Sequence, residues 1–446
     1  MAAGARVRGW LAAAFVFGLA ACEPPPTAHP VPAPPSSLRP ELSATAQALP
    51  PPVPPPVPVD NAARARELAR RLIIVDGHID VPERLEESRG PNGELTEDVT
   101  VRTPQGQFDV ERAFEGGLDA PFLSIYVPSS LQATSGASKA LAEKHIDLVR
   151  GLALRLPGKL ALAGTPDEVR ANTAAGKLSL LMGMENGSPL EGELANVAHF
   201  HARGIRYITL THARDNDISD SSFDDRRTHK GLSPFGRKVV AEMNRVGIMV
   251  DVSHLSDDAF WQVAEVSRAP FIASHSSCRH FTPGWQRNMS DEMIQALGHA
   301  GGVMMVTFGS GFLDAAIQRQ QSELWQAVGK WQKDHKVPDR DPRLQAFRAE
   351  YLKAHPMSFA PVERVADHID HIVRLVGVDH VGLGSDFEGV GDTMPVGLKD
   401  VSQYPSLLRV LLDRGYAEAD IEKICSGNLL RVWQAVIDHA RAAPEP

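Results

Sequence analysis

Residues 72–80 read Leu72-Ile73-Ile74-Val75-Asp76-Gly77-His78-Ile79-Asp80, an apolar run that passes directly into polar residues. A short, continuously apolar run rich in β-branched residues is typical of a parallel strand that is covered on both faces. His78 and Asp80 are two positions apart, so their side chains point to the same side of an extended segment and can share one metal ion. We therefore predict a buried strand that ends in metal-binding side chains.

Seven more short apolar runs follow along the chain, and helical patterns fall between most of them. Together with the first run, which we place at 72–76, the predicted strands are 122–127, 178–184, 207–211, 247–252, 271–273, 302–307 and 380–383. Eight strand-then-helix units predict an α/β fold, a (β/α)8 TIM barrel in a single large domain. A ninth run at 160–163 fits no unit, and we interpret it as an accessory strand.

One helix is especially clear in the sequence. Apolar residues between Val362 and Val376 recur at spacings of three and four, and Gly377 is placed to end the helix. His368 and His371 fall on its polar face. We predict that both are solvated and are not metal ligands.

The composition is that of an ordinary globular protein, with 43% hydrophobic and 23% charged residues in 446. Lys and Arg number 46 against 55 Asp and Glu, so the formal charge is 46 − 55 = −9, and no basic cluster stands out. Nucleic acid is therefore not an expected partner. Cys22, Cys278 and Cys425 are too few for a disulfide framework. Cys278 is left as either an inert thiol or a partner of Cys425.

The N-terminus has the pattern of an export signal. Arg6 and Arg8 precede an apolar run at 10–21, which is short for a membrane span but typical of a secretory signal. The run ends in Leu19-Ala20-Ala21-Cys22, which resembles the lipobox of bacterial lipoproteins. We predict a signal peptide over 1–21 and lipidation of Cys22.

A tether follows the predicted lipid anchor. Residues 23–59 hold 15 of the 34 prolines, and such a stretch favours extended polyproline II over a packed core. We predict a proline-rich linker over 22–60 and a folded domain over 61–446, exported from the cytoplasm and lipid-anchored to the bacterial cell envelope. Glu23 after Cys22, in place of Asp, favours the outer membrane.

Metal-binding residue types follow five more of the predicted strands. Because the active site of a (β/α)8 barrel lies at the C-terminal ends of its strands, side chains that directly follow the strands should meet there. These are Glu185, His212, His254, His275 and Asp386. Each alone is a weak signal, but their joint placement indicates a metal centre. Imidazole and carboxylate ligands suit Zn²⁺, although Mn²⁺, Co²⁺ or Fe²⁺ could occupy such a site.

The same residues allow for two metal ions, because Glu185 could give one oxygen to each. Two metals ~3.5–4 Å apart would hold a shared hydroxide and polarise a carbonyl or phosphoryl oxygen of a substrate. The pattern therefore predicts a hydrolase.

The motifs around these residues resemble those of the membrane (renal) dipeptidase family of zinc metallopeptidases. The matching segments, in chain order, are 76–80, 183–187, 207–212, 251–254, 274–277, 384–389 and Asn428-Leu429-Leu430-Arg431-Val432-Trp433. The resemblance covers roughly 72–437. It implies a barrel with two Zn²⁺ per chain that hydrolyses free dipeptides through a bridging hydroxide, L-Xaa-D-Xaa substrates included. It also suggests a homodimer.

The resemblance also assigns metal ligands, motif by motif. His78 and Asp80 would hold the first zinc, His254 and His275 would hold the second, and Glu185 would bridge them.

Three further residues receive roles toward the substrate. His212 would contact the substrate and help to stabilise the developing oxyanion. Asp386 would take a proton from the bridging water and pass it to the leaving amine. Arg287 resembles the arginine that binds the substrate's terminal carboxylate, a task suited to a planar guanidinium, while Arg279 remains a competitor.

One segment departs from the better-known animal members. Glu185 is followed by Asn186-Gly187-Ser188-Pro189 and lacks a Gly-Gly-His sequence. The contacts on that side of the pocket therefore stay open.

Other functions stay open at this level. A lactonase or phosphotriesterase on the same barrel would often use a carbamylated Lys near the fourth strand, but 207–212 contains no Lys. A metal-free surface lipoprotein would lack ligands, and none is missing. The long polar segment at about 310–357 is predicted to be a helical insertion that serves as a lid, as a dimer surface, or as an exposed hairpin without a role.

Overall fold

The computed structural model of the protein describes residues 60–338 and 341–442. The predicted signal peptide, Cys22 and all but the last residue of the predicted linker lie outside this part of the chain. Within it, none of the helices combines the length and the apolar character needed to cross a membrane.

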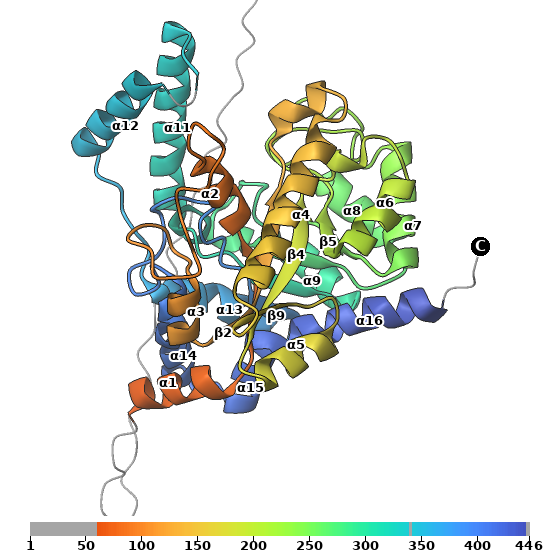
Figure 1. Ribbon diagram of the computed structural model, residues 1–446, viewed down its shortest axis with the longest axis vertical. Helices are drawn as coiled ribbons and strands as arrows, with labels where there is room; N and C mark the ends of the chain where they lie inside the picture. The colour runs from red at the N-terminus through yellow and green to blue at the C-terminus, as the bar shows by residue number, and fades with distance from the viewer. Residues whose placement is uncertain (1–59, 339–340, 443–446) are drawn as a thin grey trace, which may run out of the picture. The chain divides into compact units, whose positions relative to one another are not determined.

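Eight parallel strands form the centre of the folded domain, in the order β1-β2-β4-β5-β6-β7-β8-β9. Ile79 at the end of β1 forms a parallel bridge with Phe387, just beyond β9, and brings the two outer strands of the series together. Helices surround the sheet (Figure 1). This is the predicted (β/α)8 barrel in a single domain. The strands are β1 (Ile74–Ile79), β2 (Leu118–Tyr126), β3 (Leu160–Leu162), β4 (Leu178–Glu185), β5 (Ile205–Thr209), β6 (Met249–Asp251), β7 (Ile272–Ser276), β8 (Val303–Val306) and β9 (Val381–Leu383).

The α-helices connect and cover these strands. They are α1 (Asn61–Arg71), α2 (Val81–Glu87), α3 (Val110–Gly116), α4 (Ala137–Arg155), α5 (Pro166–Ala174), α6 (Ala195–Arg203), α7 (Pro234–Val246), α8 (Asp257–Val266), α9 (Asp291–His299), α10 (Ser310–Leu313), α11 (Ala315–His335), α12 (Pro342–Ala354), α13 (Val362–Val376), α14 (Tyr404–Asp413), α15 (Glu418–Glu422) and α16 (Asn428–Ala442). Short 3-10 or π turns are η1 (Ser129–Ala133), η2 (Ser188–Leu190), η3 (Arg279–Phe281), η4 (Val378–His380), η5 (Val401–Gln403) and η6 (Lys423–Gly427).

The eight predicted strands are all present, and three of them extend farther toward the C-terminus than predicted, whereas β5 (predicted 207–211) and β6 (predicted 247–252) end earlier, before His212 and His254. His78 lies inside β1, Glu185 is the last residue of β4, and His275 lies inside β7. In these three strands the backbone ladder continues past the apolar run, because the backbone of polar residues pairs along a neighbouring strand as well as that of apolar ones. The accessory strand is confirmed as β3, which lies off the main series and pairs with β4.

The strand register brings polar ends into one row. Tyr126 of β2 is paired with Glu185 of β4, Glu185 with Thr209 of β5, and Thr209 with Asp251 of β6. Because all these strands are parallel, the row lies at the C-terminal rim of the barrel.

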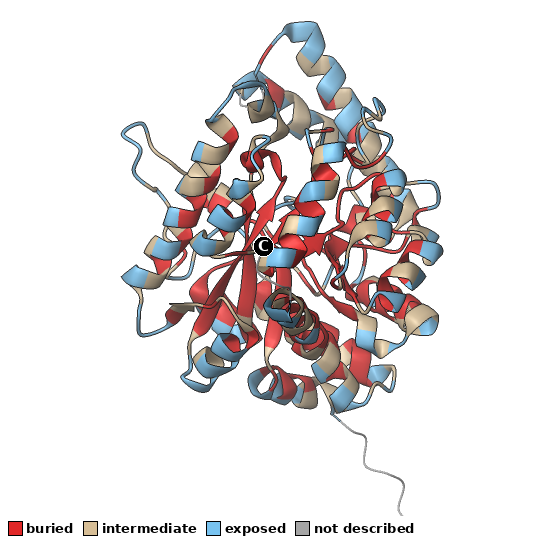
Figure 2. Cartoon of the chain, turned by 90° about the vertical axis from the view of Figure 1, so that its right-hand side faces the viewer, coloured by how far each residue is buried: buried red, intermediate tan, exposed pale blue. Residues whose placement is uncertain are grey.

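Two apolar layers hold the barrel together. The inner layer includes Phe122, Tyr207 and Trp433, with ring centroids 5.2 Å apart for Phe122 and Tyr207 and 5.7 Å apart for Phe122 and Trp433. Trp433 belongs to α16, so this helix closes the end of the barrel opposite the polar rim. The outer layer lies between the strands and the surrounding helices. Figure 2 shows buried strands at the centre and helices that expose their outer faces.

One expectation about α13 is wrong. The helix ends at Val376, before Gly377, as predicted, but His368 and His371 are buried rather than solvated. The segment after β7 folds over this face. Its Cys278 N–H donates to His368 Nδ1 over 3.0 Å, and the ring of Phe281 lies 4.3 Å from that of His368. A polar face of a helix can therefore be covered when the covering segment supplies hydrogen-bond partners.

The polar segment after β8 is helical and consists of α10, α11 and α12. A small apolar cluster of Leu324, Val328, Val337 and Leu344 joins α11 and α12. In Figure 1 these two helices stand away from the barrel.

Candidate metal centre and catalytic site

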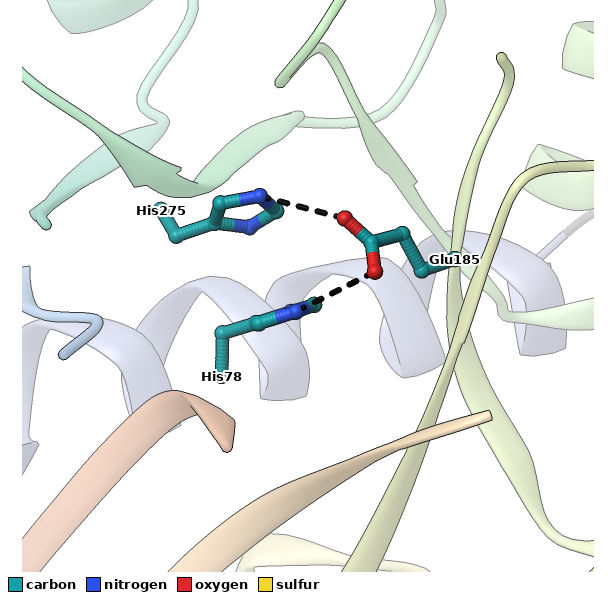
Figure 3. Close-up of side chains that lie close together, drawn as sticks. All are labelled: His78, Glu185 and His275. Atoms are coloured by element: carbon teal, nitrogen blue, oxygen red, sulfur yellow. Dashed lines mark ion pairs between the residues drawn. The ribbon is translucent and has the colours of Figure 1, made fainter. Parts of the chain in front are cut away.

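The metal-binding side chains predicted from the strand ends converge on one carboxylate. Glu185 Oε2 lies 3.4 Å from His78 Nε2, and Glu185 Oε1 lies 3.2 Å from His254 Nε2 and 3.3 Å from His275 Nε2. Figure 3 shows the two oxygens of Glu185 directed at His78 and His275. Asp80 Oδ2 joins on the first side, 3.3 Å from His78 Nε2. The site thus has two halves that share Glu185.

The chemistry of these residues fits bound cations. No hydrogen bond from the described residues satisfies the buried atoms His78 Nε2 and Asp80 Oδ1. His254 Nε2 and His275 Nε2 approach each other to 2.8 Å. Buried polar atoms are rarely left unpaired, so a group of nitrogen and carboxylate donors of this kind is typical of a metal site.

The electrostatics also favour ligation. Burial opposes ionisation of Glu185, but the surrounding imidazoles, His78 foremost, hold its pKa well below the usual range. Burial lowers the pKa of His254 and His275, and the Arg287 guanidinium lowers both further. His78 differs from these two, because burial lowers its pKa but the nearby Tyr207, Asp80 and Glu185 raise it well above the ordinary value. Neutral His254 and His275 beside an ionised Glu185 are the protonation states that bind a metal, whereas His78 would release a proton on binding one.

Two buried aspartates hold the ligand-bearing segments in place. Asp76 accepts hydrogen bonds from His78 N over 2.9 Å, from Ser385 N over 3.0 Å and from the Tyr404 hydroxyl. It therefore connects the end of β1 to the turn after β9. Burial raises the pKa of Asp76, while these hydrogen bonds oppose the rise.

Asp251 performs the same task on the opposite side. It accepts from Ser253 N over 3.1 Å, from Ser274 N over 2.8 Å and from Ser274 Oγ over 2.6 Å. Since the Ser274 hydroxyl donates to Asp251, its oxygen is free to accept from His275 Nδ1, 2.8 Å away. This leaves the Nε2 lone pair of His275 directed at the centre of the site.

Tyr207 orients the His78 ring in the same way, through a hydroxyl at Nδ1. Its hydroxyl donates to Gly77 O over 3.1 Å, and its oxygen lies 2.8 Å from His78 Nδ1, which then carries the proton. The Tyr207 ring fits only because residue 183 is glycine, where an added Cβ would lie 1.9 Å from the ring. The motif glycine before Glu185 is therefore a packing requirement.

Asp386 lies on a tight turn directly after β9. Its φ of 64° and the φ of 71° at Glu388 are in the left-handed region, which non-glycine residues rarely adopt. A Cβ on Gly389 would lie 2.3 Å from Asp80 Oδ2 and 2.4 Å from Asp386 Oδ1, so the turn needs glycine there. Burial, with the nearby charges of Asp80 and Glu185, raises the pKa of Asp386 to about 7.

The structure separates the two competing arginines. Arg287 is buried beside the centre, where its Nη2 lies 2.8 Å from His275 O and 3.1 Å from His254 Nε2. Arg279 instead forms a bidentate pair with Asp257, at 2.7 and 2.6 Å. Of the two, it is Arg287 that lies next to the metal-binding residues.

His212 approaches the centre from the end of β5. Its Nε2 lies 3.6 Å from Glu185 Oε1, and its ring packs edge-on against Tyr126 with centroids 4.9 Å apart. Burial lowers the pKa of His212, so the neutral imidazole is favoured.

The segment after Glu185, which departs from the sequence of the animal family members, is held in place by hydrogen bonds of Asn186. Asn186 Nδ2 donates to Val127 O over 2.8 Å, and Asn186 Oδ1 accepts from Ser188 N over 3.2 Å. Asn186 adopts a left-handed φ of 77°. The chain after Glu185 therefore turns sharply without a histidine at this position.

A second group of metal-binding types lies outside this centre. His280 of η3, Asp291 of α9 and His371 of α13 lie close together, but His371 is already partnered. Its Nε2 is 2.8 Å from Asp291 Oδ1, and its Nδ1 is 3.3 Å from Arg374 Nη2. These contacts join two helices. Cys278 and Cys425 are both free, buried thiols, and burial raises the pKa of each.

Sequence analysis missed the supporting residues Asp76, Asp251, Tyr207 and Ser274. A partial signal existed, because both aspartates end apolar runs and precede a histidine by two or three positions. Their hydrogen-bond partners come from other strands, and the sequence does not reveal those partners.

Comparison with known proteins identifies relatives of the whole folded domain. The sequence profile of the family described as membrane dipeptidase (peptidase family M19) matches residues 62–446. Dipeptidase 3 of Mus musculus is 35% identical over 378 residues, which is 84% of this chain and 66% of the mouse protein. An uncharacterized dipeptidase of Schizosaccharomyces pombe is 32% identical over 384 residues, 84% of this chain and 83% of the yeast protein.

Solved structures show the same fold. A probable dipeptidase, PvdM, from Pseudomonas aeruginosa superposes with a TM-score of 0.73 at 29% identity, covering 86% of this chain and 100% of that chain. A metallopeptidase from Rhodobacter sphaeroides, solved with a phosphinate mimic of the dipeptide L-Ala-D-Ala, gives a TM-score of 0.65 at 25% identity, covering 82% of this chain and 99% of that chain.

Proposed function

Because the chain belongs to the membrane dipeptidase family, peptidase family M19, we propose that it hydrolyses the peptide bond of free dipeptides at a two-zinc centre. The enzyme class, a hydrolase acting on dipeptides, follows from the family. The metal centre and the roles of individual residues are our proposal. The observation that carries it is the position of Glu185, whose two oxygens face different histidines.

The proposed ligands divide between the two halves of the site. His78 and Asp80 would hold one zinc ion, His254 and His275 the other, and Glu185 would contribute an oxygen to each. When bound, the two ions supply Lewis acidity and a water that is nucleophilic at neutral pH.

Asp386 is the proposed proton carrier. Its buried carboxylate would accept a proton from the attacking water and deliver it to the nitrogen of the leaving amine. A pKa near neutrality suits both directions of transfer, and burial raises the pKa of Asp386 to about 7.

Arg287 and His212 are the proposed substrate-binding residues. The planar Arg287 guanidinium can form paired hydrogen bonds with the C-terminal carboxylate of a dipeptide. His212, as a neutral imidazole, can donate a hydrogen bond from Nε2 to the carbonyl oxygen as negative charge develops there. A substrate held at both points presents its peptide bond to the metal ligands between them.

The substrate range is proposed to include dipeptides of the L-Xaa-D-Xaa type. Support comes from the Rhodobacter sphaeroides metallopeptidase, which was solved with a phosphinate mimic of L-Ala-D-Ala. The proposed location is the bacterial cell envelope, with the protein lipid-anchored through Cys22 to the outer membrane, and the proposed assembly is a homodimer. The lipobox resemblance supports the anchor, and family resemblance alone supports the dimer.

One experiment tests the proposed reaction. Zinc-loaded and chelator-treated samples of the full chain are incubated with L-Ala-L-Ala, L-Ala-D-Ala, their C-terminal amides, a lactone and a phosphotriester. We expect cleavage of the free dipeptides, loss of cleavage on chelation, recovery on adding zinc, and little cleavage of the amides. Elemental analysis should find two zinc ions per chain. Turnover of the lactone or phosphotriester with intact dipeptides would refute the proposal.

A further inference from the structure

Three aromatic side chains stand at the rim beside Arg287. Phe223 comes from the loop between β5 and α7 and is 46% exposed. Trp285 comes from the loop between β7 and α9, and Phe312 comes from α10 after β8, and both are half-buried. Large aromatic residues that stay partly exposed at the mouth of a site do little for the core and are available to a ligand.

These side chains form a continuous surface, which we name the aromatic arc. The ring centroid of Phe223 lies 5.8 Å from that of His254 and 6.4 Å from that of Trp285. Trp285 lies 5.1 Å from Phe312, and the Arg287 guanidinium carbon lies 5.2 Å from the centre of the Phe312 ring. The aromatic arc therefore runs from a proposed metal ligand to the proposed carboxylate-binding group.

Hydrogen bonds between the three loops fix the aromatic arc. Arg227 Nη2 donates to Gln286 Oε1 over 2.6 Å and joins the loop of Phe223 to that of Trp285. Ser222 N donates to His254 O over 2.8 Å. Asn288 Nδ2 donates to Phe312 O over 2.8 Å. The surface is therefore preorganised, so binding to it loses little conformational entropy.

We infer that the aromatic arc is the subsite for the side chain of the C-terminal residue, and that the enzyme selects dipeptides with a bulky apolar residue at that position. This inference rests on the proposed function. With the peptide bond at the metal ligands and the carboxylate on Arg287, the C-terminal Cα lies between them. The side chain on this Cα would then lie next to the aromatic arc, which runs between the same two groups, from His254 to Arg287.

The chemistry of the aromatic arc decides the preference. A leucine or phenylalanine side chain would remove apolar surface of the substrate and of Phe223 from water, which is favourable in proportion to the area buried. A glycine would bury none of this surface. An aspartate would lose hydration against aromatic rings, which is unfavourable.

The test compares kcat/KM of the zinc-loaded full chain for Ala-Leu, Ala-Phe, Ala-Gly and Ala-Asp. We expect the Ala-Leu to Ala-Gly ratio to be about ten or more. Phe223→Ala and Trp285→Ala should each lower that ratio about five-fold or more, and Phe223→Leu should retain part of it. The matched control is Trp261→Ala, because Trp261 on α8 is 44% exposed but lies outside the aromatic arc; its ratio should equal that of the parent.

A second series locates the effect on the substrate. The ratio of Leu-Gly to Gly-Gly varies only the N-terminal residue and should not change in Phe223→Ala. Equal rates for all C-terminal residues, or a preference that survives both alanine variants, would overturn the inference while the dipeptidase assignment stands. Intact dipeptides throughout would overturn the proposed function and the subsite with it.

Discussion

At the scale of single residues, Asp386 combines features that are unfavourable unless they serve a purpose. It is buried, its backbone is left-handed, and it lies close enough to Asp80 and Glu185 for their charges to raise its pKa. Strained, buried carboxyl groups of this kind cluster at active sites. The hydroxyl Oγ1 of Thr307 lies 3.4 Å from Asp386 Oδ2 and donates a long hydrogen bond to it.

The variant Asp386→Asn tests the proton transfer. An amide keeps the size of the side chain but cannot accept the proton, so we expect kcat for L-Ala-L-Ala to fall about 10²–10⁴-fold with zinc content unchanged. Asp392→Asn is the control, because Asp392 lies in the same loop with 90% of its side chain exposed. Normal turnover by Asp386→Asn would exclude the proposed role.

Arg287→Lys tests carboxylate binding. Lysine keeps the charge but loses the paired donors, so KM for free dipeptides should rise about ten-fold or more, while the slow cleavage of amidated dipeptides should change little. Arg279→Lys is the matched control, since Arg279 is paired with Asp257. If the two variants raise KM equally, Arg287 does not bind the carboxylate directly.

At the scale of elements, the turn after β9 is fastened by Glu388. One oxygen of this carboxylate, Oε1, accepts from Arg84 Nη1, Gln107 N and Phe108 N, each over 2.7 Å. Glu388 N in turn donates to Gln107 Oε1 over 2.6 Å. The loop before α3 therefore holds the segment that carries Asp386.

Glu388→Gln should loosen this turn. Removing the charge weakens three hydrogen bonds, so we expect the free energy of unfolding to fall by about 1.5–3 kcal/mol. We also expect kcat to fall about ten-fold or more as Asp386 loses its position.

Glu97→Gln provides the comparison for this variant. Glu97 bonds the same Arg84 over 2.8 Å but has 32% of its side chain exposed. The Glu97→Gln substitution should lower the free energy of unfolding by less than about 1 kcal/mol and leave kcat unchanged. A loss of stability in Glu388→Gln without a loss of kcat would make the contact purely structural.

At the scale of the whole molecule, buried neutral histidines should make the fold sensitive to acid. Burial lowers the pKa of His145 to about 4 and that of His368 to about 3. Their unfolded-state pKa is near 6.5, so below that pH the unfolded chain binds more protons than the folded one. The stability that these histidines contribute is complete above pH ~6.5 and is lost as the pH falls toward the folded-state values.

His145→Leu tests this origin of acid sensitivity. Because of His145 alone, the free energy of unfolding of the parent should be about 2 kcal/mol lower at pH 5 than at pH 7.5. In denaturant titrations at both pH values, the variant should lose correspondingly less stability than the parent over this interval. His439→Leu, near the C-terminal end of α16, is the control. An equal loss in His145→Leu and the parent would assign the acid sensitivity to other groups.

The sequence by itself determined the barrel and the composition of its site. Each strand is specified locally by a short apolar run, and parallel strand topology then requires the C-terminal ends to meet. His78, Glu185 and His275 could therefore be grouped from the strand pattern alone, although 107 and 90 positions separate them in the chain. The residue types then indicated a metal site, because imidazole and carboxylate groups together favour metal binding.

Only the tertiary structure decided how the site is supported and which neighbours surround it. Tyr404 reaches Asp76 across 328 positions, and Arg84 reaches Glu388 across 304. Packing between distant segments also buried His368 against the pattern of its own helix. Local periodicity records which face of an element is apolar, but not which segment later covers the other face. For the same reason, the aromatic arc and the pairing of Arg279 with Asp257 emerged only from the fold.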